Sequence, residues 1–324
     1  MKSIKALIPL LAVVAGIATL PHAAAQGRPI RFVVPYSAGG AVDVYARAVA
    51  VPFGRHLNQP VVIENIGGAG GNIAVARVAK SAPDGETLLY HNMAMATNPS
   101  LYRKLDYDPL NDFEFVGVAA HSVMAMVARR DLPATDLKDF IQFARANGDK
   151  ITIGDGGIGG PTNLCALLFM SAIGTKFTVV SYKGGAPALN AVMGSQIDLL
   201  CDGTATTARH IAAGKVKALG VSSRARLPSM PNVPTLAEGG LPGFELAPWS
   251  AIYAPKGTPR PAIQRLEGAL QAAISDRDLA GHFEKLGLAL ASRELATSAG
   301  LASHLKAEIE KWGVLIKKTG VQLD

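Results

Sequence analysis

The sequence is poor in cysteine and in charged residues, and these shortages narrow the chemistry that it can carry. Cys165 and Cys201 are the two cysteines in 324 residues, and they do not form a CxxC pair. They therefore do not predict a metal site. In an oxidising compartment the two thiols can form a disulfide, or they can lie apart in the core; the spacing leaves both possibilities open. Charged residues make up 18% of the chain and hydrophobic residues 49%, which is typical of a well-packed globular protein.

The usual catalytic signatures are missing as well. The chain contains no GxSxG, no HExxH and no GxxxxGK(S/T) segment. The histidines are dispersed, from His56 to His304, without the spacing of metal ligands. The formal net charge of +7 suits an anionic ligand, but the basic residues are scattered and form no cluster interleaved with aromatics. We therefore expect no enzyme activity, no metal, no cofactor and no nucleic-acid partner.

The N-terminus has the pattern of a secretory signal peptide. Lys2 and Lys5 precede an apolar run over residues 6–20, and Ala23-Ala24-Ala25 supplies small residues before Gln26. A retained anchor helix is the alternative, but the run is shorter than the roughly 20 apolar residues that a membrane span needs. We expect cleavage after Ala25 and a periplasmic protein. No cysteine follows the run, which argues against a lipid anchor.

Beyond the signal peptide, strands alternate with helices, as in an α/β fold. Residues 30–34, 61–64 and 87–91 are apolar strand-like runs, and residues 41–57 form a helical pattern with Tyr45, Val49 and Phe53 on one face. Residues 113–120 and 123–128 are two successive strand-like runs, which we interpret as a crossing between two lobes. Thr135 is expected to cap the helix that follows.

The same order of elements then restarts. A strand-like run at 151–153 is followed by a glycine turn and a helix over 162–173. Further strand-like runs follow at 177–182, 197–201 and 216–221. Residues 226–242 contain four prolines and are expected to be an irregular return connection. A strand at 250–254 and three helices close the chain against the first lobe. We predict two lobes, each a mainly parallel sheet flanked by helices: 26–125 plus 249–324, and 126–248, after the signal peptide 1–25.

Three glycine-rich strand-to-helix turns are the candidate binding elements: Ser37–Gly40, Gly67–Gly71 and Gly154–Gly160. In an open α/β sheet, ligands bind at the carboxyl ends of strands. The free N–H groups at the following helix N-terminus attract anions, so a carboxylate can be held without Arg or Lys. The alternative is that these glycines simply permit tight turns. Asp43, in a first helical turn, is interpreted as support for its loop, and His91 as a structural histidine.

One of these turns also matches a nucleotide-binding pattern. Gly154-Asp-Gly156-Gly-Ile-Gly159 fits GxGxxG between a strand and a helix. That fingerprint expects an acidic residue about 20 positions later, at the end of the next strand. Here that strand ends in Ser181-Tyr182-Lys183. A dinucleotide-dependent enzyme therefore stays a remote alternative.

Nine segments together resemble the Bug family, the solute receptors of tripartite tricarboxylate transporters. Residues 31–43 (RFVVPYSAGGAVD) resemble the first-loop signature of that family. The other segments are QPVVIEN at 59–65, GAGG at 68–71, PDGETLL at 83–89, NPSLY at 98–102, YKGGAP at 182–187, VPTLAEG at 233–239, PGFE at 242–245 and APKGTP at 254–259. The resemblance covers essentially the whole mature chain.

The resemblance implies a class II periplasmic-binding-protein fold that closes over one small organic acid, commonly a carboxylate. It also implies delivery to the membrane subunits of a tripartite transporter, and we expect a monomer. A sensing receptor for a signalling system is the alternative. Carried over by position, the ligand contacts in the first lobe are Tyr36, Ser37, Ala38, Gly39, Gly40, Asp43, Asn92, Thr97 and Asn98. Those in the second lobe are Asp155, Gly156, Gly157, Gly160, Asn163, Lys183, Gly184 and Asp202.

The second-lobe turn departs from the family pattern, which has small hydroxyl residues and a histidine at the position of Asn163. Here the turn carries Asp155, whose carboxylate has two possible orientations. If it faces the cleft, it disfavours a second ligand carboxylate, and the ligand is a monocarboxylate with a neutral, hydrogen-bond-donating or cationic far end. If it turns inward, it caps amides of its own glycine loop.

Overall fold

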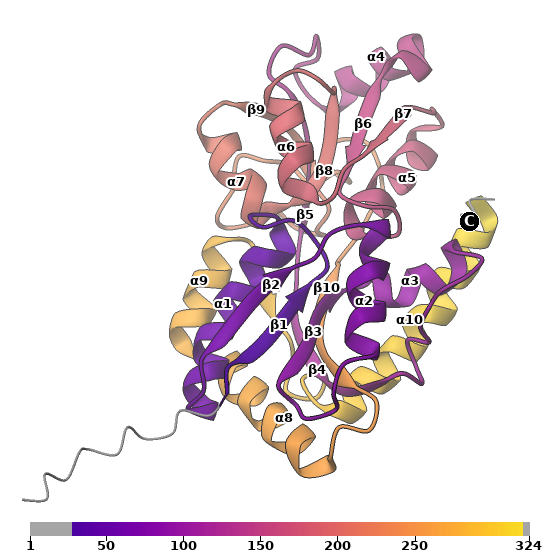
Figure 1. Cartoon of the computed structure of the whole chain (residues 1–324). Coiled ribbons are helices and arrows are strands. Elements are labelled where there is room, and N and C mark those ends of the chain that lie inside the picture. Colours follow the sequence, from indigo (N-terminus) through magenta and orange to yellow (C-terminus); the bar gives the residue numbers. More distant parts are fainter. Residues whose placement is uncertain (1–27, 320–324) are drawn as a thin grey trace, which may run out of the picture.

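The computed structural model describes residues 28–319, so the predicted signal peptide and its cleavage site lie outside the described residues. The described chain forms two α/β halves that meet in the middle of the molecule (Figure 1). Each half is built on its own sheet. We call the half that contains the first strand lobe 1 and the other half lobe 2.

Lobe 1 contains a six-stranded sheet. Its spatial order is β11 (Ala289–Leu290), β4 (Phe113–His121), β10 (Trp249–Pro255), β3 (Thr87–Asn92), β1 (Ile30–Val34) and β2 (Val61–Asn65). Lobe 2 contains a five-stranded sheet. Its order is β7 (Thr178–Ser181), β6 (Thr152–Asp155), β8 (Leu199–Gly203), β5 (Met124–Arg129) and β9 (Val216–Val221). The predicted strands are all present, and the short edge strand β11 is additional.

Both sheets are mixed, so the expectation of mainly parallel sheets was wrong in this detail. In lobe 1, β1 is parallel to β2 and β3, but β10 is antiparallel to β3 and β4. In lobe 2, β6 is parallel to β7 and β8, but β5 is antiparallel to β8 and β9. The reason lies in the crossings. β5 and β10 enter their sheets from the junction and run away from it, whereas the strands beside them end at the junction.

The chain changes sheet twice. It leaves the first sheet after His121 and joins the second at Met124, and it returns between Val221 and Trp249. The return segment contains turns and no regular strand or helix, as the four prolines of residues 226–242 predicted. Whether 26–125 plus 249–324 and 126–248 move as independent units stays a prediction.

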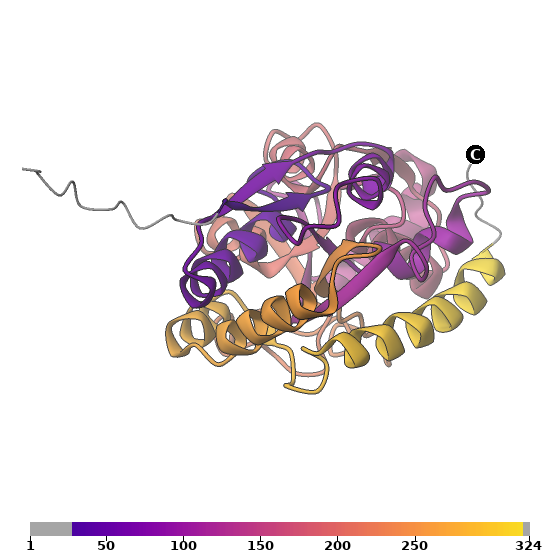
Figure 2. The same ribbon diagram turned by 60° about the horizontal axis from the view of Figure 1, so that its bottom comes forward.

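Helices cover both sheets. They are α1 (Ala41–Leu57), α2 (Asn72–Ala79), α3 (Ala94–Leu101), α4 (Leu137–Asn147), α5 (Pro161–Ile173), α6 (Gly185–Met193), α7 (Thr204–Ala212), α8 (Arg260–Ile274), α9 (Arg277–Lys285) and α10 (Ser298–Thr319), with short 3-10 turns η1 (Ala69–Gly71) and η2 (Gly148–Lys150). Figure 2 shows α8, α9 and α10 lying along one side of the molecule. α10 packs on β4 and α3, so the chain end returns to lobe 1.

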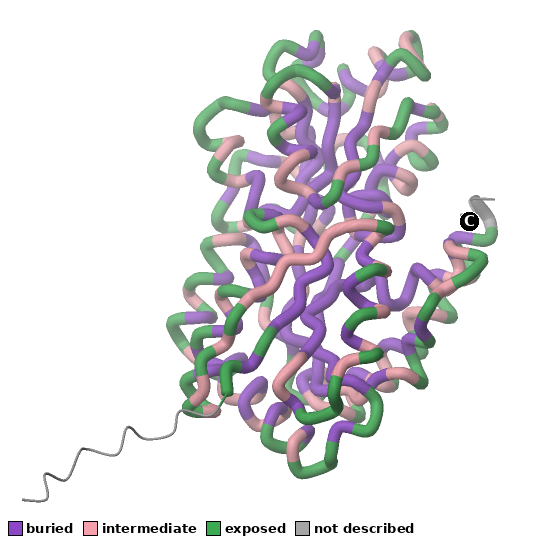
Figure 3. The backbone as a smooth tube through the Cα atoms, viewed as in Figure 1, coloured by how far each residue is buried: buried purple, intermediate pink, exposed green. Residues whose placement is uncertain are grey.

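The buried segments follow the strands of both sheets (Figure 3). One apolar cluster joins the core of lobe 1 to one face of the second sheet, and it includes Phe53 in lobe 1 and Phe169 in lobe 2. A smaller cluster, which includes Val127 and Leu200, fills the other face of the second sheet. The continuous cluster therefore connects the two lobes.

The cap of α4 differs from the expected one. Asp136 is the N-cap residue, and its side chain accepts a hydrogen bond from the Asp139 amide at 2.9 Å. Thr135 lies one residue earlier, and its hydroxyl donates to the carboxylate of Asp139. Asp and Thr are both good N-cap residues, so the sequence alone did not distinguish adjacent positions.

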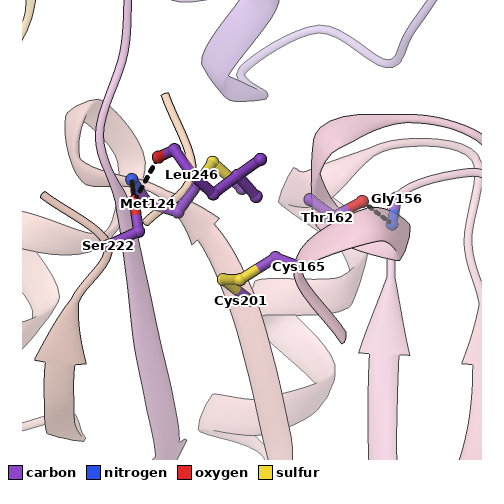
Figure 4. The surroundings of a disulfide bond; sticks show 7 residues. All are labelled: Met124, Gly156, Thr162, Cys165, Cys201, Ser222 and Leu246. Carbon is purple, nitrogen blue, oxygen red and sulfur yellow. Dashed lines mark hydrogen bonds between the residues drawn. A yellow bond between two sulfur atoms is a disulfide. The ribbon is translucent and has the colours of Figure 1, made fainter. Parts of the chain in front are cut away.

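The two cysteines form a disulfide between α5 and β8 (Figure 4). Both are fully buried, and their Cα atoms are 6.0 Å apart. In the same region Thr162 accepts a hydrogen bond from the Gly156 amide at 2.7 Å. The disulfide therefore ties the start of α5 to the strand that ends beside Asp202.

Candidate functional site

A small cavity of about 40 Å³ lies where the two lobes meet. A single water needs roughly 10–15 Å³, so in this closed arrangement the space has room for a few waters or a group of similar size. Its walls come from both lobes and from the crossing segments. The lining residues are Tyr36, Gly40, Ala41, Val42, Tyr45 and Asn92 from lobe 1, Gly156, Gly160, Pro161, Thr162, Gly185, Asp202 and Gly203 from lobe 2, and Ser122, Met124, Pro248 and Ser250 from the crossings.

Four helices begin at this cavity. They are α1, α5, α6 and α7, and each follows a strand that ends at the junction of the lobes. Glycine is the N-cap residue of all four: Gly40, Gly160, Gly184 and Gly203. Their N-termini carry partial positive charge and amides without intrahelical acceptors, which favours an anion. The amides of Ala41 and Val42, in the first turn of α1, are donors of this kind.

No lysine, arginine or histidine within residues 28–319 lines the cavity. Asp202 is the one lining carboxylate in that range, and Tyr36 and Tyr45 are the other lining groups that titrate. Burial raises the pKa of both tyrosines, so their hydroxyls stay protonated near neutral pH. The positive field in the cavity therefore comes from helix N-termini and neutral donors.

Asn92 provides the clearest unpaired donor in the cavity wall. Its Oδ1 accepts from the Ala94 amide at 2.9 Å and from the Tyr36 hydroxyl at 3.2 Å. These bonds hold the side chain in one orientation, and they leave Nδ2 buried without a partner among the described residues. A buried donor that lacks an acceptor costs about 1–3 kcal/mol. A carboxylate oxygen in the cavity would satisfy it.

Asp43 stabilises the Tyr36–Gly40 loop of lobe 1 on the side that faces away from the cavity. Its carboxylate accepts from the Gly39 amide, from Arg47 Nε and from Asn65 Nδ2, each at 2.9 Å. Partial burial works to raise the pKa of Asp43, but these hydrogen bonds and the Arg47 charge lower it overall. Because Asp43 is fully engaged and does not line the cavity, it orders the Tyr36–Gly40 loop without facing the space itself.

Asp155 turns inward, so the orientation that would place it in the cleft is ruled out. It is fully buried, and its carboxylate accepts from the Gly157 amide and Asn163 Nδ2, both at 2.9 Å, and from the Ser181 hydroxyl at 3.1 Å. Burial raises its pKa. In place of the small hydroxyl residues of the family pattern, this turn has a carboxylate that caps an amide of its own loop. The ligand restriction that we inferred from a cleft-facing Asp155 loses this basis.

The lobes also touch each other directly, outside the cavity. The Ser37 amide donates to the Lys183 carbonyl at 3.1 Å, and the Thr97 hydroxyl donates to the Gly159 carbonyl at 2.6 Å. A Cβ atom on Gly184 would lie 2.2 Å from Ser37 Oγ, and one on Gly70 would lie 2.3 Å from the Ile158 carbonyl oxygen. These glycines allow the two backbones to meet.

The predicted site residues therefore fall into two groups. Six line the cavity: Tyr36, Gly40, Asn92, Gly156, Gly160 and Asp202. The others support the loops or lie at the contact between the lobes: Ser37, Ala38, Gly39, Asp43, Thr97, Asn98, Asp155, Gly157, Asn163, Lys183 and Gly184. The sequence analysis did not predict that Ala41 and Val42 line the cavity. The predicted start of the helix at residue 41 was a usable signal, because the first amides of a helix lack intrahelical acceptors. The crossing residues were not predicted either, and the sequence carried no signal for them.

His91 does not line the cavity, and Gly156 is the one residue of the GxGxxG segment that does. His91 is fully buried, and burial lowers its pKa to about 3, which keeps the ring neutral. The glycine segment is closed off by lobe 1 and by its own lobe. A Cβ atom on Gly159 would lie 2.2 Å from Asn98 Oδ1, and one on Gly156 would lie 2.7 Å from the Gly185 amide nitrogen. A pyrophosphate has no open approach to this loop in the observed arrangement.

Comparison with known proteins agrees with this architecture. Residues 45–321 match the family model described as the tripartite tricarboxylate transporter family receptor. The chain belongs to this family. A UPF0065 protein of Agrobacterium vitis, encoded in the ttuE–ttuC′ intergenic region, is 40% identical over 292 residues, which are 90% of this chain and 84% of that protein.

Solved structures are similar over nearly the whole receptor. The periplasmic binding protein BugD is 38% identical with a TM-score of 0.88, and the match covers 91% of this chain and 98% of BugD. MatC from Rhodopseudomonas palustris with bound malate is 33% identical with a TM-score of 0.85, covering 89% and 99%. A second R. palustris protein, with adipate, is 31% identical with a TM-score of 0.86, covering 91% and 98%. The two-lobed binding-protein fold is confirmed.

Proposed function

We propose that this protein is a periplasmic receptor that binds one small carboxylate between its lobes and delivers it to the membrane subunits of a tripartite tricarboxylate transporter. The observation that carries the proposal is the unpaired Nδ2 donor of Asn92 in a cavity where four helices begin and which no cationic side chain of residues 28–319 lines. An anion is the natural complement of such a cavity. The malate and adipate in two related structures support a carboxylate in particular.

The contacts between the lobes support binding by closure. The Thr97–Gly159 and Ser37–Lys183 hydrogen bonds join opposite lobes at the rim of the cavity. Opening of the lobes requires that these bonds break, and hinge motion at crossing segments is the usual way in which such lobes open.

Export and delivery rest on the signal-like N-terminus and on the family. Within residues 28–319 no helix has the length and apolar character to cross a membrane. N-terminal sequencing of the exported protein should begin at Gln26; a chain that starts at Met1 would contradict export by cleavage. Coupling to the transporter predicts that deleting its membrane subunits abolishes uptake of the bound acid while the receptor still binds it.

The direct test converts the Asn92 donor into an acceptor. Asn92→Asp keeps the shape and the oxygen that accepts from Ala94 and Tyr36, but it places a negative charge where the unpaired donor was. Two charges 4 Å apart interact by about 4 kcal/mol at an effective dielectric of about 20, before screening. We expect calorimetry with short carboxylates to show one-to-one binding to the wild type and at least about tenfold weaker binding to the variant.

Asn190→Asp is the matched control, because it adds the same charge at an exposed position of α6 outside the cavity. It should bind like the wild type. Equal affinities of both variants would remove Asn92 from the site. Chemical conversion of any bound acid would contradict a receptor.

A further inference from the structure

Asp202 stands out among the cavity residues because it is an acidic group in a site that otherwise suits an anion. It is the penultimate residue of β8 in lobe 2, and only 2% of its surface is exposed. Its Oδ2 accepts from the Thr206 hydroxyl at 2.8 Å. None of the ion pairs found within residues 28–319 involves it. Its charge is therefore not cancelled by a basic side chain.

The surroundings of this carboxylate are backbone and neutral side chains. A Cβ atom on Gly185 would lie 2.5 Å from Oδ2 and 2.8 Å from Oδ1, so the first residue of α6 packs directly on the carboxylate. Tyr45 on α1 is the titratable group that faces it from lobe 1, and burial together with the Asp202 charge raises the pKa of that tyrosine. Burial raises the pKa of Asp202 itself to about 6, against the opposing hydrogen bonds from Gly203 and Thr206. The side chain is therefore an anion at mildly alkaline pH.

Asn92 and Asp202 face the same small cavity from opposite lobes. A carboxylate held by Asn92 and the start of α1 leaves its far end toward lobe 2. There a second carboxylate meets a buried like charge, which is strongly unfavourable at low dielectric. A hydrogen-bond donor at the far end instead gives Asp202 a partner, and donors to carboxylates form the stronger class of hydrogen bonds.

We propose that Asp202 is a specificity-determining residue that selects a short monocarboxylate whose far end donates a hydrogen bond, such as an amide, hydroxyl or ammonium group, over the corresponding dianion. This inference rests on the proposed function, since it assumes that the cavity holds a carboxylate. It restores, through a different residue, the ligand restriction that Asp155 does not impose.

The test compares acids of matched shape. Malonate, succinate and glutarate are each paired with their monoamides, which replace one carboxylate by a neutral donor of nearly the same size. Calorimetry at about pH 8, where Asp202 is ionised, should show the best monoamide binding the wild type at least about tenfold more tightly than its dianion. This comparison uses the native protein and does not depend on a variant that folds.

Asp202→Asn then assigns the preference to this side chain. The amide keeps the shape and can donate to a carboxylate, so the monoamide preference should fall to about threefold or less, or reverse. Asp278→Asn, an exposed change in α9, is the matched control and should keep the wild-type preference.

Wild-type protein that binds a dianion as tightly as its monoamide overturns the specificity role, and so does an unchanged preference in Asp202→Asn. In both cases carboxylates still bind and the proposed function stands. If no member of the three pairs and no simple monocarboxylate binds, the proposed function fails and the role of Asp202 fails with it.

Discussion

Thr97 gives the sharpest test of closure, because its side chain joins the lobes without lining the cavity. Its hydroxyl, on α3 of lobe 1, donates to the Gly159 carbonyl of lobe 2 at 2.6 Å in a buried contact. Thr97→Val keeps the shape of the side chain and removes this bond. Gly159 then keeps a buried carbonyl without a donor in the closed form.

The expected loss of ligand affinity follows from the fact that the Thr97–Gly159 hydrogen bond exists only in the closed form. Leaving a buried polar group unpaired costs about 1–3 kcal/mol. The cost arises only when the lobes close, so it subtracts from the binding free energy and not from the stability of the separated lobes. A loss of about 1.4 kcal/mol is tenfold in affinity, which predicts roughly 5- to 150-fold weaker binding. Calorimetry with the carboxylate that binds the wild type most tightly measures it.

Thr178→Val is the matched control. The Thr178 hydroxyl donates to the Asp149 carbonyl at 2.8 Å, but both residues lie in lobe 2 and the contact is exposed. This variant should bind as the wild type does. Small-angle scattering of Thr97→Val with a subsaturating acid should show more of the open form. Wild-type affinity in Thr97→Val would refute the view that this contact belongs to the bound state.

Three further predictions concern stability and pH. The Cys165–Cys201 disulfide closes a separation of 36 residues, so Cys165→Ala/Cys201→Ala should lower the free energy of unfolding in urea by up to about 4 kcal/mol on a chain-entropy basis. Asp202→Asn should stabilise the protein above pH 6 but not near pH 4. A folded pKa raised from 3.8 to about 6 means that the wild type loses stability as pH rises through that range, by about 3 kcal/mol in total. Asp155→Ser should lower the melting temperature and leave ligand preference unchanged, because its carboxylate bonds only to its own lobe; a changed preference would return it to the site.

Much of the fold could be predicted because local signals and tertiary packing agree. The helix over Ala41–Leu57 has the predicted limits. It begins after glycine, buries Tyr45, Val49 and Phe53, and ends at Asn58 in the left-handed conformation. The strand over Val216–Val221 was also found with its limits. By contrast, α3 was not predicted: it is short, and Pro99, a residue type disfavoured in helix interiors, lies within it.

The site was harder to predict than the fold, because its walls depend on contacts between distant segments. Ser122 and Ser250 reach the cavity only because the crossing strands enter their sheets from the junction. The orientation of Asp155 depends on Ser181, which is 26 residues away in the sequence and beside it in the sheet. A pattern of residues can identify a loop as a binding element, but it does not say which side of the loop faces the ligand.

The central claim is that the cavity between the lobes holds a small carboxylate, and mass spectrometry of the natively purified receptor tests it most directly. The protein is isolated from the periplasm without added acids, denatured, and the released small molecules are identified and counted against protein. We predict one short carboxylic acid per chain, chemically intact. A bound molecule that lacks a carboxyl group would contradict the account.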